Sequence, residues 1–410
     1  MRISTNQLYE RALDTMLTQQ AKTSNLQEQL ASGVRVQTPS DDPIASAQIE
    51  LLSQRIGSTE LMQKNRQAAE NALTLEESTL AATVVLTQSI QVLQVQAGDA
   101  ALSFEDRKGL AAQAKNLLSQ LQAYANTKDG SGNFMFSGGQ SSQPFSVNSS
   151  GAYVYNGDST QRFQGITGSL QMAISDTGDN IFMRIPNGNG RFSISTTGTP
   201  NTGTGSLRTG NVVNEAAYVP DNYTMTFATN TQGKLVVMVT GANSGNVLPV
   251  SGLVDDAPLY EEGKAINFNG MEIIPDGAPN AGDSFSIKPA KNESIFSTVQ
   301  RMIDNLNKPF DTAADKAATL TENNQLLAQL DSAYNTILGF QSDVGARLDQ
   351  LETANTANTN LIDTSKVALK MLREIDPIAV ATEYNKQLIN LQAAQQSFVR
   401  IQGLSLFNYL

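Results

Sequence analysis

A heptad pattern between Leu320 and Leu351 constrains the fold of this chain more than any other feature. Apolar residues follow one another there at intervals of three, four and seven, as on one face of a long helix. They are Leu320, Leu327, Leu330, Tyr334, Ile337, Val344, Leu348 and Leu351. The same register includes Asn323 and Gln341, and polar seam residues fix the register of a coiled coil. We therefore predict a long helix with a defined partner; an ordinary buried bundle helix is the alternative.

The amino terminus carries a matching helical pattern. Residues 6–32 are predicted to form a helix, and Gly33 occupies the position at which helices commonly end. Gln19, Gln20 and Thr23 interrupt the apolar face of this helix. The residues that we assign to its packing face are Leu8, Met16, Leu26 and Leu30.

A structural turn follows, for which the decisive residues are Gly33, Asp41, Asp42 and Pro43. Aspartate is a good N-cap and proline suits the first helical position, so a second helix is predicted from Pro43 to about Ala97. A third helix comes after a short break. Its seam consists of Leu110, Ala114, Leu117, Leu121 and Tyr124.

The middle of the chain has a different composition. Of the 30 glycines, 21 fall between Gly138 and Gly282. Alternating runs such as Tyr223–Ala228 and Lys234–Thr240 lie between turn clusters, which predicts an inserted all-β region. For Thr196–Gly210 we expect a linker or disorder.

Helical patterns return near Ser294 and continue to the carboxyl end. Asp376 and Pro377 repeat the Asp42–Pro43 start signal and predict a final helix. The residues assigned to the packing face of that helix are Tyr384, Leu388, Leu391 and Phe398. A chain that is helical at both ends, with the strands inserted between them, brings its ends together.

The predicted class is therefore α+β: a long antiparallel helical bundle or coiled coil formed by both chain ends, with an inserted all-β domain. The 410 residues are enough for two or three domains. The expected parts are an amino-terminal assembly helix (1–42), the first part of a helical bundle (43–137), an inserted β region (138–290), the second part of the bundle (291–365) and a carboxy-terminal assembly helix (366–410). Within the insert we expect a hairpin-rich part (138–185) and an outer β domain (186–290).

The composition excludes several classes of function. Cysteine, histidine and tryptophan are absent, which removes the usual zinc and copper ligands and the Cys–His and Ser–His–Asp nucleophile systems. We expect no enzyme, no metal site and no cofactor. The net charge is -11 without a basic block, which argues against nucleic acid as a partner. No run approaches 18 unbroken apolar residues, so we expect no membrane insertion.

Several motifs resemble the flagellin family. Residues 32–36 followed by 39–43 resemble its amino-terminal signature, and Val344-Gly345-Ala346-Arg347-Leu348 resembles its carboxy-terminal counterpart. Within the family, three segments resemble the members that lie at the hook–filament junction. These are residues 132–138 with Pro144-Phe145, then Tyr155-Asn156-Gly157-Asp158, and the ending Ser405-Leu406-Phe407-Asn408-Tyr409-Leu410. The similarity covers about the first 180 and the last 120 residues.

The resemblance implies a structural protein of the bacterial flagellum that serves motility. It implies that both ends pair as helices in a self-assembled tube, and that the chain is secreted through the flagellar export system without a cleaved signal. The partners implied are hook-associated protein 1, flagellin, further copies of the chain in a ring-like helical layer, and a cytoplasmic export chaperone. The assembly-interface residues expected on this basis include those assigned above to the terminal helices, together with Leu406, Leu410 and, as a polar anchor, Arg347.

Two alternatives stay open. The chain could be a flagellin filament subunit, although its last six residues and the start of its insert favour a junction member. The insert could also be an adhesive β module mounted on a flagellin-like base.

Overall fold

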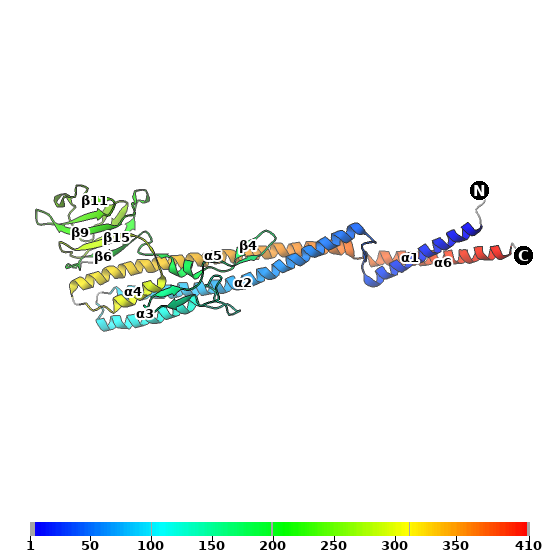
Figure 1. The fold of residues 1–410 in the computed structure, drawn as a ribbon, viewed down its shortest axis with the longest axis horizontal. Helices are drawn as coiled ribbons and strands as arrows, with labels where there is room; N and C mark the ends of the chain where they lie inside the picture. Colours follow the sequence, from blue (N-terminus) through cyan, green and yellow to red (C-terminus); the bar gives the residue numbers. More distant parts are fainter. Residues whose placement is uncertain (1–4, 100, 198–199, 311, 408–410) are drawn as a thin grey trace. The chain divides into compact units, whose positions relative to one another are not determined.

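The computed structural model describes residues 5–99, 101–197, 200–310 and 312–407. In this part of the chain, long helices come first and last in the sequence, and a region of short antiparallel strands lies between them in the sequence (Figure 1). The predicted α+β class is therefore confirmed. The helices are α1 (Thr5–Ser32), α2 (Pro43–Ala97), α3 (Phe104–Ala125), α4 (Ile295–Leu306), α5 (Ala313–Arg373) and α6 (Pro377–Phe407). The predicted starts at Pro43 and Pro377 are both confirmed.

By packing, the chain divides into two units. The terminal unit comprises the residues up to Asn65 together with those from Thr353, and the central unit is Arg66–Glu352. The division falls inside α2 and α5, whereas the sequence placed boundaries after residues 42 and 365. Those boundaries stay a prediction about assembly regions.

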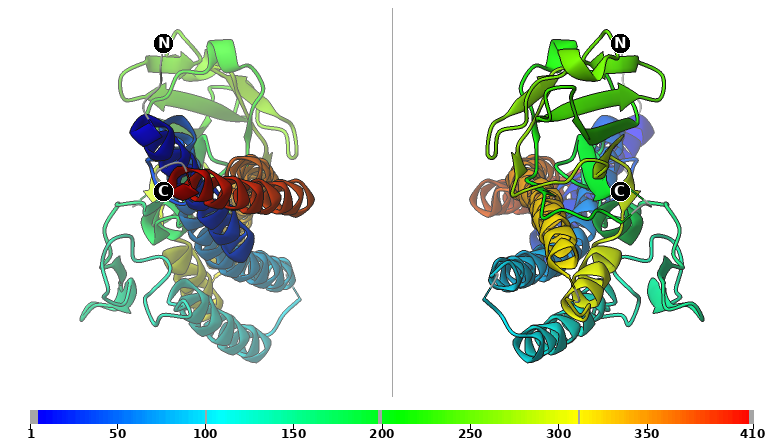
Figure 2. Two further views of the ribbon diagram at one scale, coloured as in Figure 1. Left: turned by 90° about the vertical axis from the view of Figure 1, so that its right-hand side faces the viewer. Right: turned by 90° about the vertical axis from the view of Figure 1, so that its left-hand side faces the viewer.

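The helices of the central unit form a bundle, with α3 packed on α4 (Figure 2). One heptad column of the predicted seam is fully buried: Leu330, Ile337, Val344 and Leu351. The rest of the seam differs, because Leu320 is exposed while Leu326 and Ala333 are buried. Helix α5 is covered on more than one side here, by α2 and α4 and also by the β region, so its buried surface is wider than a two-helix seam.

Helix α2 is more apolar than the search for unbroken runs indicated. It contains an 18-residue window with a mean hydropathy of 1.2, which by length and composition alone could cross a membrane. Half of that window is buried inside the protein. Core helices commonly pass this test, because a bundle buries the same residue types as a bilayer.

The β region begins with two hairpins, β1–β2 and β3–β4, and continues as a five-stranded sheet in the order β11-β10-β9-β15-β6 beside a three-stranded sheet, β12-β13-β8. Neighbouring strands in both sheets are antiparallel. The strands are β1 (Phe145–Val147), β2 (Tyr153–Tyr155), β3 (Phe163–Gly165), β4 (Gln171–Ala173), β5 (Ile185–Pro186), β6 (Phe192–Thr196), β7 (Ser206–Leu207), β8 (Asn211–Val212), β9 (Tyr223–Thr229), β10 (Leu235–Gly241), β11 (Gly245–Leu248), β12 (Ile266–Phe268), β13 (Met271–Ile273), β14 (Pro275–Asp276), β15 (Ser284–Pro289) and β16 (Asn292–Glu293). The predicted strands at Tyr223–Ala228 and Lys234–Thr240 are the β9–β10 hairpin.

The expectation of a linker or disorder over Thr196–Gly210 is wrong for the part that the structure describes. Strand β7 pairs with β14, and Leu207 is fully buried. The buried carboxylate of Asp283 accepts hydrogen bonds from the backbone N–H groups of Thr202 (2.7 Å) and Gly203 (3.0 Å). A polar, glycine-rich segment is ordered here because a distant carboxylate satisfies its backbone, and local composition does not report such a partner.

An aromatic cluster joins the start of the insert to the bundle. The Phe145 ring lies 5.1 Å from that of Phe296 on α4 and 5.5 Å from that of Phe182, and all three side chains are fully buried. Phe182 lies in a single π-helical turn, Asp179–Met183. This cluster fixes the β1–β2 hairpin of the insert to the helices of the central unit.

Candidate assembly interface

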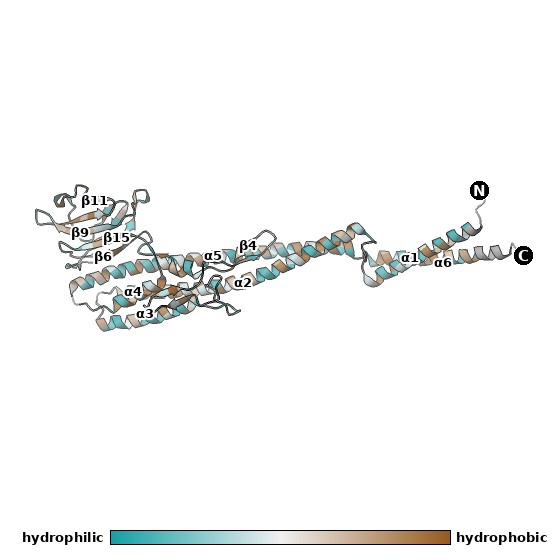
Figure 3. Cartoon of the chain, viewed as in Figure 1, coloured by the Kyte–Doolittle hydropathy of each residue, from teal (hydrophilic) through white to brown (hydrophobic). Residues whose placement is uncertain are grey.

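In the terminal unit, α1 and α6 pack side by side in opposite directions (Figure 1). The ring of Tyr9 lies 5.0 Å from the ring of Phe398, close to the two ends of the chain. In the coloured parts of both helices, apolar and polar residues are interspersed, as Figure 3 shows. The pairing joins segments that are almost 400 residues apart.

Seven of the predicted interface residues are half-buried on these two helices. Met16, Leu26 and Leu30 on α1 are half-buried. So are Tyr384, Leu388, Leu391 and Phe398 on α6. The side chains of Leu8 and Leu406, and the whole of Leu410, lie outside the described residues. The role of the whole set in contacts between subunits stays a prediction.

Two of the three polar residues that interrupted the predicted face of α1, Gln19 and Thr23, belong to it in the structure, whereas Gln20 is exposed. Thr23 is buried and its hydroxyl donates to the carbonyl of Gln19 (2.8 Å). One side-chain oxygen of Gln19 and one of Gln387 on α6 are also buried. Amphipathic periodicity misses such positions because it counts only apolar residues; the i, i+4 spacing of Gln19 and Thr23 was the available signal.

A second contact closes the other end of the helix pair. The backbone N–H of Arg35 donates to the carbonyl of Arg373 (2.7 Å), and that of Ile375 donates to the carbonyl of Gly33 (3.2 Å). The Arg35 guanidinium also reaches the carbonyl of Leu372 (3.1 Å). The loop after α1 and the loop before α6 are therefore joined by main-chain hydrogen bonds.

Three of the four predicted turn residues lie in the loop between α1 and α2, and the fourth, Pro43, is the first residue of α2. Gly33 has a φ of +71°, a conformation that favours glycine. The carboxylate of Asp41 accepts from the backbone N–H of Thr38 (2.8 Å), which lowers the pKa of Asp41. Asp42 caps α2 by accepting from the N–H of Ala45 (3.0 Å), which likewise lowers the pKa of Asp42. Asp42 also pairs with Arg35 at 3.2 Å.

Arg347, expected as a polar anchor between subunits, has an intramolecular partner. Its guanidinium donates to Asp176 at 2.7 Å, and both side chains are largely buried in the central unit. Its part in subunit contacts stays a prediction. Among the described residues, no three carboxylates lie close enough together to hold a metal ion.

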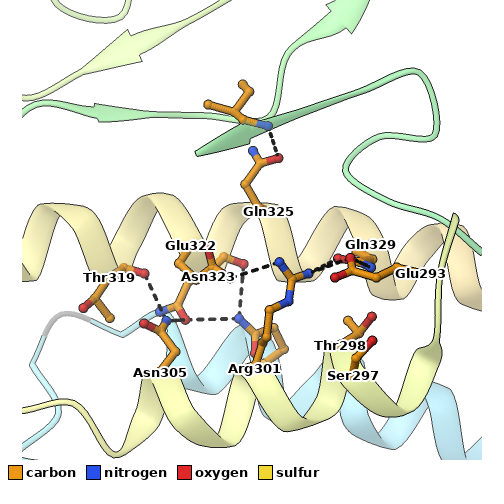
Figure 4. Close-up of polar contacts among 12 residues, drawn as sticks. Glu293, Ser297, Thr298, Arg301, Asn305, Thr319, Glu322, Asn323, Gln325 and Gln329 are labelled. Carbon is orange, nitrogen blue, oxygen red and sulfur yellow. Dashed lines mark hydrogen bonds and ion pairs between the residues drawn. The ribbon is translucent and has the colours of Figure 1, made fainter. Parts of the chain in front are cut away.

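The polar seam residue Asn323 connects three helices of the central unit (Figure 4). Its side-chain oxygen accepts from Asn305 on α4 (2.9 Å) and from Gln94 on α2 (3.2 Å). Its amide nitrogen donates to the carbonyl of Ala97 (3.1 Å). Because all these groups are buried, sliding α5 along its neighbours would leave them unpaired, which is how a polar seam residue fixes register.

The neighbouring turn of α5 holds the β region. The side-chain oxygen of Gln325 accepts from the backbone N–H of Ile194 in β6 (2.9 Å). Arg301 on α4 pairs with Glu293 (3.2 Å), at the point where the insert returns to the bundle (Figure 4). Bundle and insert are thus connected through α5.

Replacing Asn323 by alanine is expected to lower the free energy of unfolding of the central unit by about 1–3 kcal/mol, because buried donors and acceptors lose their partner. The matched control is Gln341→Ala at the other polar seam position, where the side chain makes a single hydrogen bond to Glu77 (3.0 Å). Urea unfolding followed by circular dichroism measures both changes. Equal losses for the two variants would contradict the register role.

Comparison with known proteins agrees with this architecture. Residues 3–141 match the bacterial flagellin N-terminal helical region and residues 327–410 match the bacterial flagellin C-terminal helical region. A crystal structure of flagellar hook-associated protein 3 from Legionella pneumophila is 65% identical, with a TM-score of 0.78, and the match covers 79% of this chain and 98% of that one. The chain belongs to the flagellar hook-associated protein 3 family.

Two further relatives extend this finding. The flagellar junction protein FlgL of Legionella pneumophila, also known from a crystal structure, is 64% identical with a TM-score of 0.74, over 80% of this chain and 99% of that one. Flagellar hook-associated protein 3 of Salmonella typhimurium is 26% identical over 408 residues, 99% of each chain. As a member of this family, the chain is a structural protein of the bacterial flagellum, and the resemblance drawn from its motifs is confirmed.

Proposed function

We propose that this chain is the junction subunit that links the hook-associated layer to the flagellin filament. The observation that carries the proposal is the antiparallel pairing of α1 and α6 in a chain 64% identical to a flagellar junction protein. The Tyr9–Phe398 contact and the loop pairing at Arg35 bring the two ends of the chain into one unit, so that both terminal helices could join the same layer of a tubular assembly.

Exposed apolar side chains of the terminal unit support an assembly role. Ile44, Met371 and Ile378 are 74%, 77% and 79% exposed, and they lie close to the loops that join the helices. Further large apolar residues are exposed along the same unit. They are Leu17, Leu51, Leu61, Val367, Ile389 and Val399. Apolar side chains that are this exposed and recur along one unit would be covered if other subunits packed on it.

The partners follow from the junction role. The proposed neighbours are hook-associated protein 1 on the hook side, flagellin on the filament side, and further copies of this chain within the layer. The proposed route is export through the flagellar secretion channel with the help of a cytoplasmic chaperone. Contacts that rest on apolar groups and uncharged amides are expected to depend only weakly on salt.

A deletion strain tests the proposal. Cells that lack this chain are expected to carry hooks without filaments and to release flagellin into the medium, and the intact gene supplied in trans restores filaments. Electron microscopy of the cells, together with the amount of this chain in sheared flagella, gives the answer. Filaments on the deletion strain, or this chain as the main protein of sheared filaments, would contradict the junction role.

A further inference from the structure

A buried carboxylate cluster lies where the β3–β4 hairpin returns to the bundle. Glu76 on α2 and Asp176 in the loop after β4 are both buried. One oxygen of Glu76 accepts from the backbone N–H of Asp176 (2.9 Å). The Asp176 carboxylate accepts from Gln161 (2.8 Å) and Arg347 (2.7 Å). The loop is thus held between α2 and α5 by one side chain from each helix.

The second oxygen of Glu76 has no hydrogen-bond partner, although it is buried. The Nη1 group of Arg347 and the hydroxyl of Thr177 are buried without a partner as well. An ionised carboxylate with a bare buried oxygen is costly, whereas a protonated one carries no charge there. Glu76 therefore fits this site as a neutral acid.

The charges that act on Glu76 come from three other segments. Asp176 repels its negative charge, whereas Arg347 on α5 and Arg162, which precedes β3, favour it. On α2 itself, the adjacent Glu77 is bonded to Gln341. Burial is the largest effect and the charge of Asp176 adds to it, so that the pKa of Glu76 is raised from 4.5 to about 8.

We propose that Glu76 is a proton-controlled latch. As a neutral acid it holds the loop of residues 175–178 against α2 and α5, and loss of its proton loosens this loop and the β3–β4 hairpin that leads into it. The hairpin exposes Phe163, so the latch ties the placement of an apolar surface group to the pH of the medium.

Linkage gives the sign and the pH window. When the loop opens, Glu76 meets water and regains a pKa near 4.5, so opening releases a proton at any pH between that value and about 8. The latch is strongest below about pH 4.5, weakens as pH rises through the window, and no longer changes above about pH 8. Inside this pH window, the equilibrium constant for opening of the loop is expected to rise about tenfold per pH unit.

Hydrogen exchange of the purified full-length protein tests the latch. The readout is the protection factor of the amides of Asp176 and Gly178, which bond to Glu76 and to the carbonyl of Phe136 (2.9 Å each). A protection factor is the intrinsic exchange rate divided by the observed exchange rate. The pH dependence of base-catalysed exchange therefore cancels from it. It is expected to fall about tenfold per pH unit between about pH 5.5 and 7.5, and to level off above about pH 8.5.

Three comparisons make the result decisive. Glu76→Gln keeps the shape without the titration, and its protection is expected to be flat with pH. Glu77→Gln removes the adjacent carboxylate and is expected to keep the slope. The amide of Val237 in β10, which donates to the carbonyl of Pro258 (3.0 Å), reports whether each variant is folded.

A flat profile in the unaltered protein would overturn the latch, and so would a slope that persists in folded Glu76→Gln. If Glu76→Gln does not fold, the pH slope of the protection factor is compared between the unaltered protein and Glu77→Gln. The latch then requires the same slope in both, and a slope that disappears in Glu77→Gln would overturn it. None of these outcomes depends on flagellar assembly, so failure of the latch leaves the junction role untouched.

Discussion

Removing helix α6 from Pro377 onward is expected to abolish assembly while the central unit stays folded. Helix α1 packs on α6, and both helices are otherwise largely exposed in the single chain. Most helical stability in proteins comes from the packing of an amphipathic face, so α1 is expected to lose most of its helical structure without its partner. Cells that make only the truncated chain should carry hooks without filaments, whereas the thermal midpoint of the central unit should change little.

Substitutions at two adjacent residues of α6 can distinguish the pairing of α1 with α6 from the assembly of subunits. Leu388 is half-buried on the side of α6 that faces α1, and Ile389 is exposed. Leu388→Ser is expected to reduce amide protection of α1 in the purified protein, whereas Ile389→Ser is expected to leave it unchanged and to weaken filament attachment only. Truncated chains that still support filaments would contradict the role of the α1–α6 pair.

Replacing Phe145 by alanine is expected to cause the largest loss of stability of any single substitution considered. Its ring is fully buried among the rings of Tyr155, Phe182 and Phe296, with centroids 5.1–5.5 Å away. A cavity in such a site costs about 3–5 kcal/mol, because the surrounding rings collapse only partly. Chemical denaturation of the central unit measures the change.

The matched control for Phe145→Ala is Phe163→Ala. Both substitutions delete the same atoms from a strand of the insert, but Phe163 is 59% exposed. Its replacement is expected to change stability by less than about 0.5 kcal/mol. Comparable losses in the two variants would mean that the aromatic cluster does not hold the β1–β2 hairpin to α4.

Local signals predicted the helices well. Asp42 with Pro43 and Asp376 with Pro377 marked helix starts that the structure confirms, because capping depends on neighbouring residues alone. The motif at residues 32–43 indicated a special turn for the same reason. Longer-range features were harder to predict. The partner of Arg347 is Asp176, 171 residues away, and nothing near either residue announces the other.

Segment 202–210 is a second case in which a distant partner could not be predicted from the local sequence. Composition predicted disorder, yet Asp283 supplies the acceptor that those backbone groups need, from 80 residues further on. Likewise, Gln19 and Thr23 appeared to interrupt an apolar face, but in the folded terminal unit Thr23 is buried and Gln19 is half-buried.

The sequence alone determined the helix starts at Pro43 and Pro377, the nested order of helices and strands, and the flagellin-like motifs, since each depends on residues close together in the chain. It also indicated that Asn323 would fix a register. Only the tertiary structure decided what Asn323 bonds to, which loop Glu76 holds, and how α1 meets α6. These contacts join residues tens to hundreds of positions apart, and their energies depend on burial, which a local pattern does not contain.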